Sequence, residues 1–394
     1  MPFDVAAIQE ALKSAKLDGW LLYDFHGSNP IAARLLGTAD GAKMTTRRWF
    51  YLVPAAGEPT GLVHAIERRT LDALPGRKIM YAGREQLDAG LTTLLSGMKR
   101  VAMEYSRDCA IPYVSRIDAG TMDLVRGRGI EVESSGDLVQ RFEAVWDDHA
   151  LATHREASQA LYRVKDRAFE TIARLARGRE AMTEFAIQQQ MAGWFEEEGL
   201  ISDSSPVVAA QENAGDPHYL PTAGRTRQIG ANELVLLDLW AKKKGDPRAV
   251  YADITWVGFT GSAVPDEMAR AFEAIRQGRD AAVALVQEAA RDHRDLRGWE
   301  VDRAASSVLE RAGFEERILH RTGHNLGREV HGNGVHMDDY ETHDDRRLLP
   351  GTGFTIEPGL YFDSFGVRTE INMFYGQHEA LVTGAVQTEI VRLV

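Results

Sequence analysis

The first part of the chain alternates between helical and strand-like patterns of apolar residues. An amphipathic stretch over residues 4–16 places Val5, Ile8 and Leu12 on one helical face. The strand-like runs that follow lie at residues 20–25, in a hairpin over residues 49–67, and at residues 78–81 and 100–104. A helical stretch separates the last two runs. This alternation predicts a small α/β domain over residues 1–150.

From Asp148 onward the apolar spacing changes to that of long helices. Apolar residues recur at the helical period in four stretches, residues 151–177, 183–198, 265–291 and 299–312. Strand-like segments lie between and after these helices. Residues 151–394 therefore predict an α+β domain in which antiparallel hairpins have helices packed on one side.

Composition and charge narrow the class of protein. The 394 residues are 44% hydrophobic and 26% charged, as in ordinary globular proteins long enough for two domains. A net charge of −12 argues against a general nucleic-acid binder and against a polybasic membrane protein. No apolar run is long enough for a transmembrane helix, and the acidic, amphipathic start does not resemble a signal peptide. Cys109 is the single cysteine, which fits a reducing compartment, so we expect a cytoplasmic protein.

The first domain offers no catalytic constellation. Its candidate reactive side chains are scattered along the sequence, at His26, His64, Asp108 and Cys109. Surface or packing roles are the better interpretation for them.

Two apolar strand-like runs in the second domain each carry one aspartate. Asp238 lies in the run over residues 234–240, and Asp253 lies in the run over residues 250–259. If the loop between them spans residues 243–248, the two aspartates face each other across a hairpin. Facing carboxylates repel and burial raises the cost, so a cation between them would be stabilising. The alternative is that one aspartate caps a turn and the other is solvated.

A second pair of acids occurs near the end of the chain, in TIEPGLYFDSFGVRTEINMF over residues 355–374. If Asp363 and Ser364 form a two-residue turn, Glu357 lies directly opposite Glu370. The flanking residues are mostly apolar or aromatic. Two hairpins that both present facing acids from apolar strands are hard to explain as solvated faces.

Four histidines lie between the two hairpins, within HRTGHNLGREVHGNGVHMDD at residues 320–339. The interspersed glycines suit tight backbone near a site. For any single histidine, a hydrogen-bonded structural role is more common than metal ligation. The absence of HExxH excludes the helical zinc site of zincin proteases. Two Asp, two Glu and one or more His form a ligand set that suits Mn²⁺, Co²⁺ or Zn²⁺, as one ion or as two bridged ions.

Five motifs, in one order along the chain, resemble the pita-bread metallopeptidases, the family that includes prolidases (Xaa-Pro dipeptidases), aminopeptidase P and methionine aminopeptidases. The motifs are VLLDL (235–239), YADIT (251–255), TGHNLGREVH (322–331), TIEPGLY (355–361) and GVRTEI (366–371). The resemblance implies a C-terminal pita-bread (creatinase/aminopeptidase) fold over residues 151–394. The N-terminal half resembles the creatinase-like domain of the Xaa-Pro branch, which implies a smaller α/β domain over residues 1–150.

The resemblance also implies a divalent metal site of one or two ions, Mn²⁺, Zn²⁺ or Co²⁺. Its ligands would be Asp238, Asp253, His324, Glu357 and Glu370. Asp253 and Glu370 would bridge both ions. Asp238 would bind one ion, and His324 with Glu357 would bind the other.

The resemblance further implies residues that act on the substrate. His218 and His331 match substrate-side histidines of the family, and Glu357 matches the carboxylate proposed to exchange protons with an attacking water. Arg368 shares a strand face with Glu370 and is a candidate for orienting a ligand or binding a substrate carboxylate. The alternative for Arg368 is an ion pair with a metal-binding acid.

The chain departs from the family pattern at several positions. Trp256 stands where an arginine is frequent, Trp240 where a glycine is common, and Gly332-Asn333-Gly334 where Glu-x-Pro is frequent. The turn KKKGDP also looks longer than usual. None of these changes removes a ligand, but they bear on the charge network around the metal and on the number of ions bound.

From these observations we expect a metal-dependent peptidase that hydrolyses the bond before proline in Xaa-Pro dipeptides or short peptides. Family resemblance implies a homodimer, and we expect neither nucleic-acid nor membrane partners. Aminopeptidase P, acting on longer Xaa-Pro peptides, is the first alternative. Methionine aminopeptidase is disfavoured by the separate N-terminal domain. A non-catalytic pita-bread binding protein and a metal-free creatinase-type hydrolase are disfavoured because all five ligand positions are present.

Overall fold

The computed structural model describes residues 3–37, 45–178 and 182–394. The chain divides into two compact units, the first ending at Glu143 and the second beginning at Ala144. The boundary expected at residue 150 falls within the first long helix of the second unit. Each unit has its own hydrophobic cores.

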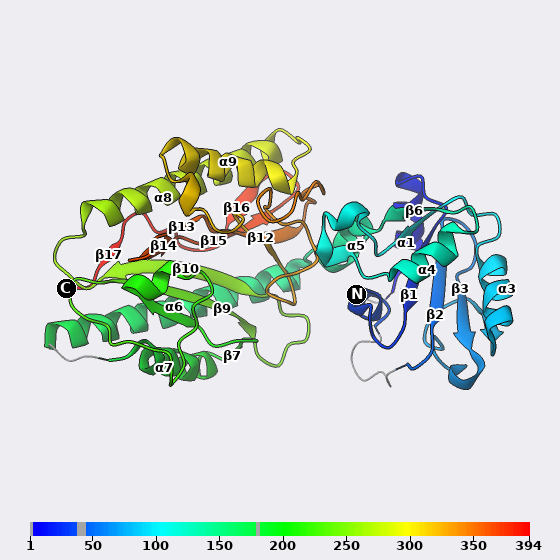
Figure 1. Ribbon diagram of the computed structural model, residues 1–394, viewed down its shortest axis with the longest axis horizontal. Helices are drawn as coiled ribbons and strands as arrows, with labels where there is room; N and C mark the ends of the chain where they lie inside the picture. Colours follow the sequence, from blue (N-terminus) through cyan, green and yellow to red (C-terminus); the bar gives the residue numbers. More distant parts are fainter. Residues whose placement is uncertain (1–2, 38–44, 179–181) are drawn as a thin grey trace. The chain divides into compact units, whose positions relative to one another are not determined.

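The first unit contains a mixed six-stranded sheet (Figure 1). In pairing order its strands are β4 (Arg77–Tyr81), β3 (Thr60–His64), β2 (Trp49–Pro54), β1 (Gly19–Asp24), β5 (Arg100–Met103) and β6 (Glu131–Ser134). Strand β2 pairs antiparallel with β1 and β3, whereas the other pairs are parallel. The predicted hairpin over residues 49–67 is therefore confirmed.

Helices cover both faces of this sheet. They are α1 (Val5–Ser14), α2 (Pro30–Leu35), α3 (Arg84–Leu94), α4 (Ala119–Arg126) and α5 (Gly136–Glu143). Apolar residues of α1, α2 and α5 pack on one face, and those of α3 and α4 pack on the other. This arrangement is the α/β architecture expected from the alternating pattern.

The second unit contains four long helices and three small sheets. The helices are α6 (Asp148–Gly178), α7 (Glu184–Glu197), α8 (Asp266–Arg291) and α9 (Gly298–Arg311), close to the predicted ranges. The largest sheet joins β17 (Val391–Arg392), β10 (Ala252–Phe259), β9 (Leu234–Lys243) and β7 (Leu200–Ile201), with β8 (Val207–Ala210) also on β9. A second joins β11 (Asn325–Leu326), β12 (Thr352–Ile356), β15 (Ile371–Tyr375) and β16 (Ala380–Val382). The third pairs β13 (Gly359–Tyr361) with β14 (Gly366–Arg368).

The apolar faces of the long helices hold the sheets between them. Leu161 and Val164 of α6 are fully buried against β9 and β10. Val286 of α8 and Val301 of α9 are fully buried in a core with Phe354 of β12. In Figure 1, α8 and α9 lie on the opposite side of the strands from α6 and α7. Each such side chain contributes about 1.5–3 kcal/mol by leaving water, so the helices fix the strands that carry the acids.

The register of the first acidic hairpin differs from the prediction. Asp238 pairs with Thr255, and Asp253 pairs with Trp240, so the expected direct pairing of the aspartates is wrong by two positions. The loop is longer than assumed because β10 begins at Ala252, after Tyr251 donates its N–H to Gly327 O outside the hairpin. A shift of two residues keeps both carboxylates on the same face of the sheet.

The register of the second acidic hairpin is as predicted. Gly359 pairs with Arg368 next to the turn, and the same alignment resumes where Ile356 pairs with Ile371. Glu357 and Glu370 lie opposite each other in the gap between these two ladders. Their backbone N–H groups bond instead to Thr322 O and Thr255 O, which ties the hairpin to its neighbours.

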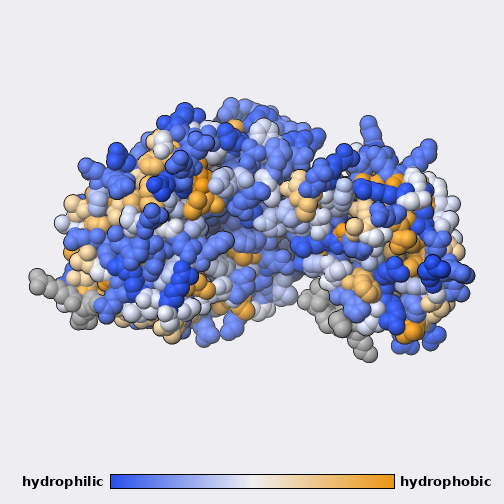
Figure 2. All heavy atoms as spheres, viewed as in Figure 1, coloured by the Kyte–Doolittle hydropathy of each residue, from blue (hydrophilic) through white to orange (hydrophobic). Residues whose placement is uncertain are grey.

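The visible surface of both units is mainly hydrophilic, with scattered apolar spots (Figure 2). Among the described helices, none has a stretch long and apolar enough to cross a membrane. Both observations agree with the composition.

One acidic side chain is fully buried in the first unit. The carboxylate of Glu104 accepts hydrogen bonds from Trp20 Nε1 at 2.7 Å, Asn29 Nδ2 at 2.7 Å and Ser135 Oγ at 3.1 Å. Asn29 also caps α2, so Glu104 connects Trp20 of β1 to the start of α2. Burial raises the pKa of Glu104 from 4.5 to about 7, against these three hydrogen bonds, which lower it.

The buried Glu104 predicts a pH-dependent stability of the first unit. Because the folded state raises the pKa of Glu104, its protonated side chain stabilises the folded unit fully below pH 4.5. This stabilisation is lost as the pH rises to about 7. We expect the free energy of opening to fall over this window by about 3 kcal/mol more in the wild type than in Glu104→Gln. Hydrogen exchange of the β1 and β5 amides, corrected for intrinsic rates, measures it. Parallel curves for the two proteins would contradict this assignment.

Candidate metal centre

Four acidic side chains and one imidazole converge on one face of the strands of the second unit. Asp238 comes from β9 and Asp253 from β10. Glu357 follows β12, Glu370 precedes β15, and His324 precedes β11. Ligand atoms of Asp253, His324 and Glu370 lie within 4.8 Å of one another. The topology thus brings together side chains that are up to 132 positions apart in the sequence, from Asp238 to Glu370.

The imidazole of His324 faces the acids with a lone pair. Its Nδ1 lies 3.3 Å from the carbonyl oxygen of Asn325, which can only accept a hydrogen bond. Its Nε2 lies 3.3 Å from Glu357 Oε1 and 3.6 Å from Asp253 Oδ2. Burial, with the neighbouring His331, lowers the pKa of His324 to about 3, so the ring is neutral at pH 7. A neutral imidazole nitrogen aimed at carboxylate oxygens is the arrangement of a metal ligand.

Two buried carboxylate oxygens have no hydrogen-bond partner in the part of the chain that the structure describes. They are Asp253 Oδ1 and Glu370 Oε1. The other oxygen of Glu370 accepts a hydrogen bond from Thr255 Oγ1 at 2.7 Å. A buried, unpaired carboxylate oxygen is costly unless it coordinates a cation.

Mutual repulsion is the second sign of a cation site. Burial raises the pKa of Asp253 well above its usual range, and Glu370, Asp238 and Glu357 raise it further. Burial likewise raises the pKa of Glu370, with Glu357 and Asp238 adding to the effect. The donor set of carboxylates and one neutral imidazole suits a divalent transition metal. The residues present therefore fit the metal that the sequence implies.

Arg368 is the one cationic side chain that we find bonded directly to these acids among the described residues. It is 5% exposed, and each of its three guanidinium nitrogens has a partner. Nη2 donates to Asp238 Oδ2 at 2.5 Å, and Nε donates to Thr255 Oγ1 at 3.1 Å. Burial raises the pKa of Asp238, and Arg368 opposes that shift. This geometry matches the ion-pair alternative for Arg368.

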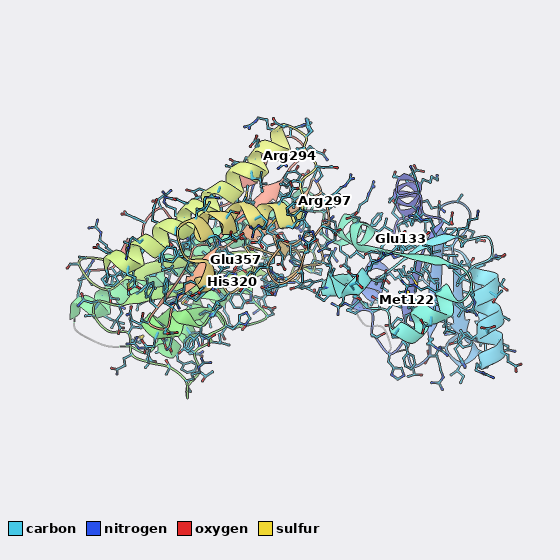
Figure 3. All side chains as sticks on the ribbon, turned by 45° about the horizontal axis from the view of Figure 1, so that its top comes forward. Met122, Glu133, Arg294, Arg297, His320 and Glu357 are labelled. Atoms are coloured by element: carbon cyan, nitrogen blue, oxygen red, sulfur yellow. The ribbon has the colours of Figure 1, made fainter. Side chains whose placement is uncertain are left out.

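The third guanidinium nitrogen leads to two residues that sequence reasoning did not assign. Arg368 Nη1 donates to the hydroxyl of Tyr361, which lies 2.7 Å from both Nη1 and His320 Nε2. His320 Nδ1 lies 2.6 Å from Arg321 O and therefore carries the proton of the neutral ring. Its Nε2 then accepts a hydrogen bond from the Tyr361 hydroxyl. His320 and Glu357 are labelled in the second unit in Figure 3. The sequence signal for His320 was its place among the four histidines of residues 320–339.

Close backbone approach fixes the loop that carries His324. The His324 N–H donates to Thr355 Oγ1 at 2.9 Å, and Thr355 Oγ1 donates to Glu357 Oε1 at 2.9 Å. A Cβ atom on Gly323 would lie 2.1 Å from Thr355 O. The same addition on Gly327 would meet only one atom, at 3.9 Å. Of these two glycines, only Gly323 is sterically required.

His331 lies beside His324, and both His331 and His218 are exposed. The rings of His331 and His324 are 4.3 Å apart between centroids, at 89°. The surrounding protein lowers the pKa of His331, and nearby Arg321 and His218 lower it further. The effect of His218 on His331 indicates that the two predicted substrate-side histidines lie near each other.

A buried glutamate holds the loop of His218. Glu184, fully buried at the start of α7, accepts hydrogen bonds from Ala210 N at 2.7 Å and Arg227 N at 2.9 Å. It also accepts one from the hydroxyl of Tyr219, the residue after His218, at 2.6 Å. The sequence offered no signal for this role beyond an acid in a first helical turn.

The two tryptophans that depart from the family pattern lie on different faces. Trp240 is directly opposite Asp253 in the ladder, so its half-buried indole shares the face of the acids, and its Nε1 donates to Asp203 at 2.7 Å. Trp256 follows Thr255 and faces the other side, where the Lys165 ammonium lies 4.0 Å from the centroid of its ring. Only Trp240 lies on the metal-binding face.

Comparisons with known proteins agree with this geometry. A sequence model of metallopeptidase family M24 matches residues 152–376. The Xaa-Pro dipeptidase of Lactobacillus helveticus is 31% identical over 176 residues, 44% of this chain and 43% of that protein. The probable dipeptidase PepE of Mycobacterium tuberculosis is 24% identical over 325 residues, 81% of this chain and 78% of that protein. The chain thus spans about half of the length of the Lactobacillus relatives that it matches.

Solved structures share the fold over the full length. Dipeptidase PepE of Mycobacterium ulcerans aligns with a TM-score of 0.70 and 21% identity, covering 99% of this chain and 96% of that one. A prolidase of Thermococcus sibiricus aligns with a TM-score of 0.65 and 18% identity, covering 100% and 99%. The fold is the pita-bread fold with an N-terminal α/β domain. The chain belongs to metallopeptidase family M24, as its motifs indicated.

The glycine contacts predict unequal effects of two matched substitutions. Gly323→Ala forces the His324 backbone away from Thr355, so we expect metal affinity to fall by about 10–100-fold, as for other losses of ligand support. Gly327→Ala should leave it within about twofold, because the added methyl meets open space. Metal titration of both variants, with circular dichroism as a folding control, measures the difference. Equal affinities in the two variants would refute the steric argument.

The position of Trp240 predicts a role in substrate preference. We expect Trp240→Ala to change the ratio of kcat/KM between peptides with a small and with a large residue before the cleaved bond by about tenfold, the usual scale for pocket contacts. Trp256→Ala is the control, since its indole faces away from the acids, and should leave the ratio unchanged. Metal content of both variants should equal that of the wild type. Identical preferences in all three proteins would show that Trp240 does not line the substrate site.

Proposed function

We propose that the protein is a metal-dependent Xaa-Pro dipeptidase that hydrolyses the peptide bond before proline. The observation that carries this proposal is the cluster of four acids around His324, with Asp253 Oδ1 and Glu370 Oε1 buried and unpartnered among the described residues. Membership of a metallopeptidase family and the names of the relatives support the reaction and the substrate class.

The metal ligands in this proposal are Asp238, Asp253, His324, Glu357 and Glu370. Asp253 and Glu370 would be the ligands shared by two ions, because each has one carboxylate oxygen without a hydrogen-bond partner among the described residues and both lie close to His324. A bound Mn²⁺, Zn²⁺ or Co²⁺ supplies an acidified water and a Lewis acid for the scissile carbonyl.

The remaining steps belong to residues of the chain. Glu357, whose Oε1 is oriented by Thr355, accepts the proton of the attacking water and returns it to the leaving amine. His331 and His218 lie on the open side and donate hydrogen bonds to the substrate and to the developing oxyanion. Arg368 keeps Asp238 ionised and oriented rather than contacting substrate, because its three nitrogens already have partners.

Aminopeptidase P activity on longer peptides is the alternative that the experiment distinguishes. A putative Xaa-Pro aminopeptidase of Mycoplasma pneumoniae is 26% identical over 202 residues, so the relatives include both activities. We favour the dipeptidase because two relatives that are each 31% identical to this chain, over 176 and 195 residues, carry that name. We also propose that the protein acts as a homodimer.

The test is hydrolysis of Xaa-Pro dipeptides by protein loaded separately with Mn²⁺, Zn²⁺ or Co²⁺. We expect turnover that chelation abolishes, with dipeptides preferred to longer Xaa-Pro peptides by at least about tenfold in kcat/KM. Asp253→Asn keeps the side-chain shape but removes a bridging carboxylate, so activity should fall by more than about 100-fold and metal content should fall with it.

Each other outcome has a definite meaning. Cleavage only of longer peptides would replace the dipeptidase with aminopeptidase P. Full activity of Asp253→Asn after chelation would refute the metallopeptidase proposal. Circular dichroism of the variant separates loss of metal from loss of fold.

A further inference from the structure

The first unit contains a hollow that the metal centre does not use. It has a volume of about 810 Å³ and is lined only by residues between Tyr23 and Leu124. Tyr23, His64 and Tyr81 lie at or next to the carboxyl ends of β1, β3 and β4, which run in the same direction. In open α/β sheets, ligands bind in the crevice outside the carboxyl ends of the strands. The hollow therefore occupies the usual ligand position of such a sheet.

The charges that line the hollow are mainly positive, although the chain has a net charge of −12. The lining includes three guanidinium groups, of Arg47, Arg48 and Arg84, and one carboxylate, of Asp118. The carboxylate is already engaged, because Asp118 caps α4 by accepting a hydrogen bond from Thr121 N at 2.9 Å. This excess of positive charge in the lining favours the binding of an anion.

Two of these guanidinium groups are available for a ligand. Arg47 donates to the hydroxyl and carbonyl oxygens of Thr46. For Arg48 and Arg84, the described residues provide neither a side-chain hydrogen bond nor an ion pair. An arginine fork without a protein partner can bind a carboxylate or phosphate through two parallel hydrogen bonds.

The remaining lining indicates an anion with an apolar or aromatic part. Tyr23, Tyr81, Leu87 and Leu124 contribute carbon surface, and the ring of Phe25 is 43% exposed at the edge of the hollow. The Phe25 ring therefore offers apolar surface beside the cationic groups of the same hollow. Helix α3 also begins at the hollow, and its N-cap residue, Gly83, provides no side-chain cap.

We propose that this hollow is a second ligand site, which binds a small organic anion with a carboxylate or phosphate group on an aromatic or apolar body. Arg48 and Arg84 bind the charged group, and Phe25 covers the apolar part. The site consists entirely of side chains of the first unit and does not depend on the peptidase activity.

Isothermal titration of the full-length protein with phenyl phosphate, phenylacetate and inorganic phosphate tests the proposal. We expect saturable binding at one site, with the phenyl-bearing anions tighter than inorganic phosphate. The tighter of phenyl phosphate and phenylacetate identifies the charged group. Arg48→Gln and Arg84→Gln should each weaken binding by about tenfold, as expected for the loss of a charge-assisted hydrogen bond. Arg69→Gln, an exposed arginine of the same unit outside the hollow, is the charge-matched control and should change affinity by less than about twofold.

Two further measurements locate the binding. Hydrogen exchange should show protection by phenyl phosphate in peptides that contain Phe25, Arg48 and Arg84, which excludes binding at the metal centre as the source of the heat. Phe25→Ala should weaken the binding of the phenyl-bearing anions but not that of inorganic phosphate. This variant tests the site even if the arginine variants are unstable. No saturable binding, protection confined to the second unit, or equal weakening by Arg69→Gln would overturn the proposal.

Discussion

The repulsion among buried carboxylates is the constraint on which the catalytic unit depends. Asp253 and Glu370 are almost completely buried, each has an oxygen without a partner among the described residues, and Asp238 and Glu357 lie close enough to raise their pKa values. Such a group would not stay together unless the backbone fixed it. The strands therefore supply the rigidity, and a divalent cation at this candidate site would supply the missing charge.

The backbone of each acid is held by a group from another strand. Asp253 N–H donates to Asn372 Oδ1 at 3.0 Å, and Glu370 N–H donates to Thr255 O at 3.1 Å. Thr255 Oγ1 in turn accepts from Arg368 and donates to Glu370, which uses both roles of a hydroxyl in one place. The two acidic hairpins are thus interlocked, and a displacement of one strand would move ligands on both. This explains why the acids come from hairpins rather than from flexible loops.

The sequence predicted most of the helices and strands and pointed to acids that the fold brings together, because apolar periodicity and acids within apolar runs are local signals. It predicted the second hairpin correctly since the short turn at Asp363 sets the register. It misplaced the first by two positions, because the loop after β9 is stabilised by Tyr251 bonding to Gly327, a contact 76 residues away in sequence that no local pattern reveals. The hydrogen bonds between Glu184 and the loop of His218 were not predicted for the same reason. The sequence shows which polar residues occur within apolar runs, but the fold decides which groups they bond to.

Arg368 shows how a cationic side chain can lie beside the candidate metal site without filling it. Its planar guanidinium contacts Asp238, Thr255 and Tyr361 in three directions at once, which the point charge of a lysine could not do. One positive charge cannot neutralise four carboxylates, so the cluster still favours binding of a divalent cation. The hydrogen bonds also leave Asp253 Oδ1 and Glu370 Oε1 untouched. Arg368 therefore orders the outer side of the acid cluster while its centre stays available for metal.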